Sequence, residues 1–123
     1  MLRLGTVVHR VTDMPRAVDF WTRALGYVVR DGSVGEEWTT LVPAHGEGVG
    51  LSLDRTDEPP PAYPHVHLDL YAVDAADQAA EVERLVGLGA ERVEWDHYPD
   101  DPDFVVLADP AGNRFCVIDT SHP

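Results

Sequence analysis

The first strand and helix are visible in the order of polar and apolar residues. Positions 6–12 alternate between two faces, which is typical of a half-buried strand. Thr6, Val8 and Arg10 share one face, and Val7, His9 and Val11 share the other. A helix is predicted next, because Asp13 can cap it, Pro15 is tolerated in the first turn and Gly26 can end it. Its apolar residues recur at helical spacing, which predicts one buried face.

The same order of elements occurs twice. In the first half, three strands are expected after the helix, at 27–30, 37–42 and 49–54. Residues 57–64 contain four prolines and predict a linker. The second half predicts a strand at 66–72, a helix from Asp74 or Ala75 to Leu88, and strands at 92–95, 104–107 and 115–119.

We therefore predict an α+β fold made of two βαβββ modules, about 1–56 and 65–123. Neither module has enough core to be stable alone. The two are expected to form a single domain, 1–123, whose curved mixed sheets surround a cavity with the helices outside.

Composition excludes several classes of partner. The net charge of -13 opposes binding to nucleic acid or to an anionic membrane. No apolar run approaches the roughly 18 residues that would span a bilayer. The lone Cys116 cannot form an internal disulfide, so we expect a cytoplasmic protein. All nine basic residues are arginine, which is typical of a GC-rich bacterial genome.

Six short motifs occur in an order that resembles a known family. They are Thr12-Asp13-Met14, Ala17-x-x-Phe20-Trp21, Ala24-Leu25-Gly26-Tyr27, His67-Leu68-Asp69-Leu70, Leu88-Gly89-Ala90 and Ala108-Asp109-Pro110-x-Gly112-Asn113. Together they resemble the glyoxalase, bleomycin-resistance and dioxygenase family of the vicinal oxygen chelate superfamily, in its glyoxalase-like branch. The resemblance runs nearly end to end and implies the fold, whereas the reaction has to be argued from the site.

The resemblance also implies four positions at which metal-dependent relatives hold their ion. They fall on Thr6, on residues 52–54, on His67 and on Cys116. Of these positions, only His67 is a typical retained ligand. We therefore expect no metal and no other cofactor. If a divalent metal were bound, His67 would hold it, with Asp54 or Asp69 as substitute ligands.

His67 and Asp69 are the candidate catalytic residues, because a carboxylate two residues along a strand can orient the imidazole. The same alternation is also typical of the solvent face of a sheet. Arg10 can clamp a ligand carboxylate or pair with Asp69, and Trp38 can stack on a ligand or fill the core. The predicted ligand-binding residues are Thr6, Val8, Arg10, Trp38, Leu53 and Cys116.

Three functions remain open from the sequence. The first is a small-molecule-binding protein or a metal-independent enzyme acting on a small organic substrate. The second is a metal-dependent lyase, isomerase or dioxygenase of the glyoxalase type that uses His67. The third is a non-catalytic oligomerisation or regulatory module. In each case we expect a homodimer, because open sheets leave edges to cover.

Overall fold

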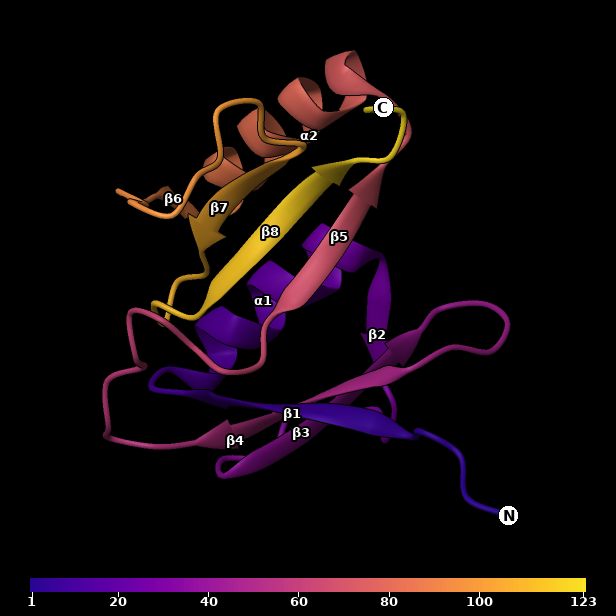
Figure 1. Ribbon diagram of the computed structural model, residues 1–123. Coiled ribbons are helices and arrows are strands. Elements are labelled where there is room, and N and C mark those ends of the chain that lie inside the picture. The colour runs from indigo at the N-terminus through magenta and orange to yellow at the C-terminus, as the bar shows by residue number, and fades with distance from the viewer. The chain divides into compact units, whose positions relative to one another are not determined.

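A computed structural model describes all residues, 1–123 (Figure 1). The chain forms two compact units. Module 1 is Met1–Pro60 and module 2 is Pro61–Pro123. The division falls inside the predicted linker. No helix has both the length and the apolar character needed to cross a membrane. That the two modules form one domain around a cavity stays a prediction.

Each module is a four-stranded mixed sheet with one helix. In module 1 the elements are β1 (Thr6–Val11), α1 (Met14–Leu25), β2 (Tyr27–Val29), β3 (Trp38–Pro43) and β4 (Gly50–Arg55). In module 2 they are β5 (Leu68–Ala72), α2 (Ala75–Leu88), β6 (Glu91–Arg92), β7 (Phe104–Ala108) and β8 (Arg114–Asp119). The sheet orders, β1-β4-β3-β2 and β5-β8-β7-β6, are equivalent, so the predicted α+β fold with two βαβββ modules is confirmed.

Both helices begin where the capping residues predict. The carboxylate of Asp13 accepts a hydrogen bond from the backbone N–H of Arg16 at 3.1 Å, and that of Asp74 accepts one from Asp77 at 2.8 Å. Gly26 ends α1 with φ of 69°, in the left-handed region that favours glycine. These local contacts fix the residue at which each helix begins after the first strand of its module.

The register of module 1 separates the two faces of its sheet. β1 runs parallel to β4 with His9 opposite Leu53, and the His9 ring lies 5.8 Å from that of Trp21 on α1. This face therefore packs against the helix, and Leu53 on it is fully buried. The prediction that Leu53 shares a face with Thr6, Val8 and Arg10 is wrong, because adjacent strand residues point to opposite faces and Ser52 and Asp54 hold the shared positions.

Two strand boundaries in module 2 also differ from the prediction. β5 begins at Leu68 instead of residue 66, because Leu68 pairs with Phe115 near the start of β8 and the preceding residues have no partner in the ladder. β6 ends at Arg92 instead of residue 95. Trp95 lies outside the strand, with its ring 5.2 Å from that of Tyr63.

Candidate functional site

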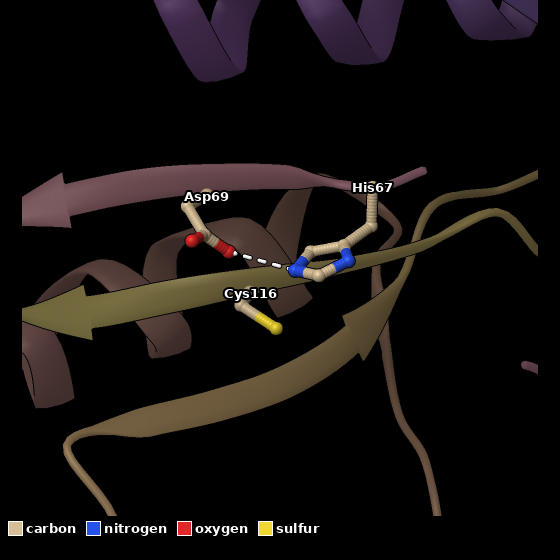
Figure 2. Close-up of side chains that lie close together, drawn as sticks. All are labelled: His67, Asp69 and Cys116. Carbon is tan, nitrogen blue, oxygen red and sulfur yellow. Dashed lines mark hydrogen bonds and ion pairs between the residues drawn. The ribbon is translucent and has the colours of Figure 1, made fainter. Parts of the chain in front are cut away.

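The strongest candidate site in module 2 is a histidine held by a carboxylate. His67 immediately precedes β5 and Asp69 lies on it, and their side chains meet with Nε2 and Oδ1 3.0 Å apart (Figure 2). The two side chains are 44% and 46% exposed, so the pair is formed but is not enclosed by its own module. The predicted juxtaposition of His67 and Asp69 is therefore present, while their contact with a ligand stays a prediction.

Cys116 lies beside this pair, on the neighbouring strand. Asp69 is its register partner on β5, and the ligand atoms of His67, Asp69 and Cys116 all lie within 4.8 Å of one another. Burial raises the pKa of the Cys116 thiol to about 11, with further contributions from the negative charges of Asp69 and Asp103. The thiol is therefore protonated at neutral pH and is a poor nucleophile.

The His67–Asp69 pair can accept a proton or a hydrogen bond. When Nε2 carries the proton and donates it to Asp69, the ring is oriented and Nδ1 keeps a free lone pair. Within module 2, Nδ1 has no hydrogen-bond partner. Such an imidazole can bind a ligand O–H or N–H group, or act as a general base toward it.

In module 1, the sheet face opposite α1 carries a chain of hydroxyl groups. The Oγ atom of Ser52 lies 2.8 Å from Oγ1 of Thr6 and 2.9 Å from Oγ1 of Thr40. Trp38 extends the chain, because its indole Nε1–H donates to Oγ1 of Thr40 at 3.2 Å. Ser52 and Thr40 are buried, and the hydrogen bond between their hydroxyls satisfies both groups where water cannot reach them.

The remaining predicted residues of this face lie around the hydroxyl chain. Arg10 pairs with Asp54 at 3.8 Å and with Glu58 at 3.4 Å, both in its own module. Val8 and Trp38 are about half exposed. Thr6, Val8, Arg10 and Trp38 therefore share one face as predicted, and their contact with a ligand stays a prediction.

The donors at the four implied metal positions do not fit a hard divalent ion. Thr6 and Ser52 offer neutral hydroxyls that are hydrogen-bonded to each other, where such a site needs carboxylates or imidazoles. Cys116 is a protonated thiol. At 52–54 the carboxylate of Asp54 is paired with Arg10 at 3.8 Å, which leaves His67 as the typical ligand of the set.

Sequence reasoning missed the hydroxyl chain and the role of Glu58. Ser52 lay within the range considered for metal ligands, but its bonds join residues 46 and 12 positions apart. Only a correct strand register could have revealed them, since Thr40 and Ser52 are register partners. Glu58 lies in the predicted linker, where nothing in the local pattern singles it out.

A family model described as a glyoxalase-like domain matches residues 6–118. No match was found among curated proteins. Among solved structures, UcmS2 is 27% identical with a TM-score of 0.65, and the match covers 98% of this chain and 99% of that one.

Two further structures carry more descriptive names. A glyoxalase/bleomycin resistance protein/dioxygenase family enzyme from Burkholderia phytofirmans is 13% identical, with a TM-score of 0.72 and coverage of 94% and 97%. A mutant of the fosfomycin resistance protein FosX from Listeria monocytogenes, complexed with Mn(II) and a dihydroxypropylphosphonic acid, is 14% identical, with a TM-score of 0.70 and coverage of 94% and 87%. At these identities the likeness shows the fold alone. With the family model spanning nearly the whole chain, the protein belongs to the glyoxalase-like domain family of the vicinal oxygen chelate superfamily.

Proposed function

We propose that this chain binds a small organic molecule through the His67–Asp69 pair without a metal ion, as a binding protein or as a metal-independent enzyme. The observation that carries the proposal is the 3.0 Å contact between His67 and Asp69, which orients a half-exposed imidazole. The free Nδ1 atom of His67 would accept a hydrogen bond from the ligand.

If the protein is an enzyme, His67 would act as the general base. The carboxylate of Asp69 would stabilise the imidazolium that forms when Nδ1 takes a proton from an acidic C–H or O–H group of the substrate. Asp69 would keep its hydrogen bond to the ring and would not need to take up the proton itself. Cys116 would stay neutral beside the pair and would contribute only to the shape of the site.

A metal-dependent lyase, isomerase or dioxygenase is the second candidate. It is favoured by one observation, the grouping of ligand atoms from His67, Asp69 and Cys116 within 4.8 Å. The FosX structure, which is named as a complex with Mn(II), has the same fold. Against this candidate, the thiol of Cys116 would first have to lose a proton whose pKa is about 11.

The proposal is tested by equilibrating the purified chain with a library of small metabolites and separating bound compounds by gel filtration. Compounds released from the protein are identified by mass spectrometry, and metal is measured in the same sample. We expect a compound that is retained by the wild type and lost in His67→Gln. His65→Gln is the matched control, since His65 is an exposed histidine two residues away. Equal retention by His67→Gln and the wild type would refute the proposal.

A further inference from the structure

The face of module 1 opposite α1 presents an aromatic ring in a fixed position. Trp38 is 47% exposed, and Val8 on the same face is 48% exposed. Exposing an indole forgoes hydrophobic stabilisation of about 25 cal/mol for each Å² of apolar surface left in water. The ring nevertheless stays in place, because its Nε1–H donates to Thr40 at 3.2 Å.

The hydrogen-bond acceptor for the indole is itself held firmly. Thr40 is buried, and its hydroxyl is bonded to Ser52 at 2.9 Å. The Trp38 side chain therefore loses conformational freedom when the module folds and not when a ligand arrives. A ring fixed in this way stacks on a planar ligand at a smaller entropic cost than a mobile one.

The charges beside Trp38 disfavour an anion. Asp54 is the register partner of both Trp38 and Arg10, so these three residues form one row across the sheet. Arg10 is shared by two carboxylates, those of Asp54 and Glu58. One guanidinium between two carboxylates leaves a net negative charge at this end of the face, which repels a ligand carboxylate or phosphate.

The hydroxyl chain sets a second requirement on the ligand. Its protons can run in one direction, from Trp38 through Thr40 and Ser52 to Thr6, whose hydroxyl donates to the backbone carbonyl of Val7 at 3.4 Å. In this arrangement each hydroxyl proton is used within the chain. The chain then has only acceptor lone pairs left, and Thr6, at its partly exposed end, can accept a hydrogen bond from a ligand O–H or N–H.

We infer that this face binds a planar aromatic molecule that carries no negative charge and has an O–H or N–H donor, with its ring stacked on Trp38. The inference goes beyond the proposed function, because it concerns the face of module 1, whereas His67 and Asp69 lie in module 2. It adds Trp38 as the residue that selects a flat ring and the Arg10–Asp54–Glu58 group as the feature that excludes anions.

The test compares two probes with the same ring system, neutral 2-naphthol and anionic 2-naphthoate. The chain has three tryptophans, so NMR resolves one indole N–H signal for each, and Trp38→Phe assigns that of Trp38. We expect 2-naphthol to shift the Trp38 signal and 2-naphthoate to bind at least about tenfold more weakly. Equal affinities for the two probes, or no shift with 2-naphthol, would overturn the inference.

Substitutions separate the stacking from the charge effect. Trp38→Leu should weaken 2-naphthol binding roughly tenfold, and Trp38→Phe, which keeps a ring, should weaken it less. Trp95→Leu is the control, because Trp95 is an aromatic residue of module 2, and it should leave the affinity unchanged. Unchanged binding in Trp38→Leu, with the buried Trp21 signal still at its native position, would also overturn the inference.

Glu58→Gln tests the exclusion of anions, because it removes one of the two carboxylates that neutralise Arg10. The affinity for 2-naphthoate should rise by roughly several-fold, while the affinity for 2-naphthol stays the same. A further variant, His67→Gln, distinguishes the two proposals. Loss of 2-naphthol binding in Trp38→Leu but not in His67→Gln would support this inference independently of the proposed function. Loss in His67→Gln with unchanged binding in Trp38→Leu would overturn the inference.

Discussion

Replacing Ser52 with alanine should destabilise module 1 more than the size of the change suggests. The hydroxyl is fully buried and bonds Thr6 at 2.8 Å and Thr40 at 2.9 Å. A hydrogen bond contributes about 1 kcal/mol net, so the loss of both lowers the free energy of unfolding by about 2 kcal/mol. Most of this loss arises at Thr40, because water can reach the partly exposed Thr6 but not the buried Thr40.

Urea unfolding followed by circular dichroism and by tryptophan fluorescence measures this change. Ser33→Ala is the matched control, since Ser33 lies in an exposed turn and has no side-chain hydrogen bond, and it should stay within about 0.5 kcal/mol of the wild type. A double-mutant cycle of Ser52→Ala with Thr40→Val should show a coupling of about 1 kcal/mol. If Ser52→Ala behaves like the control, or if the two changes add without coupling, the hydroxyl chain does not stabilise the sheet.

Three further predictions concern other parts of the chain. With a pKa of about 11, Cys116 should react slowly with a disulfide reagent at neutral pH and quickly in urea; fast reaction of the folded protein would contradict its burial. The hydrogen bond to Asp101 raises the pKa of His122 above 6.5, so its stabilising effect is complete below that value and is lost as the pH rises through the raised pKa. His122→Gln should therefore cost more stability at about pH 5.5 than at about pH 8.5, and an equal cost at both would refute the pairing. Light scattering should give twice the 13.6 kDa of one chain, and the monomer mass would contradict the proposed homodimer.

The parts of the fold that the sequence predicts well depend on local contacts. Asp13 and Asp74 each cap a helix by accepting a hydrogen bond from the backbone N–H three residues later. Gly26 ends α1 through its own backbone conformation. The His67–Asp69 pair belongs to the same class, because residues two apart in an extended segment share a face. These features were available from the spacing of residues alone.

The parts that were wrong or missed depend on long-range pairing. The face of Leu53 follows from the parallel register that places His9 opposite it, and strand parity within the sequence does not contain that register. The sequence also gives no sign that Arg10 pairs with Asp54 across the ladder and with Glu58 from the linker, and its contact with a ligand stays a prediction. No local pattern contains this information, because it is created when β1 and β4 come together.

His67 and Asp69 are proposed to bind a small molecule without a metal ion. The most direct test of this proposal is the affinity of the compound retained in the mass spectrometric experiment, measured by calorimetry before and after exhaustive treatment with a chelator. We predict the same affinity in both samples, a loss of roughly tenfold or more in His67→Gln, and a smaller loss in Asp69→Asn, which keeps a hydrogen-bond partner for the ring. Loss of binding on chelation, with recovery on adding Mn²⁺ or Zn²⁺, would contradict the claim.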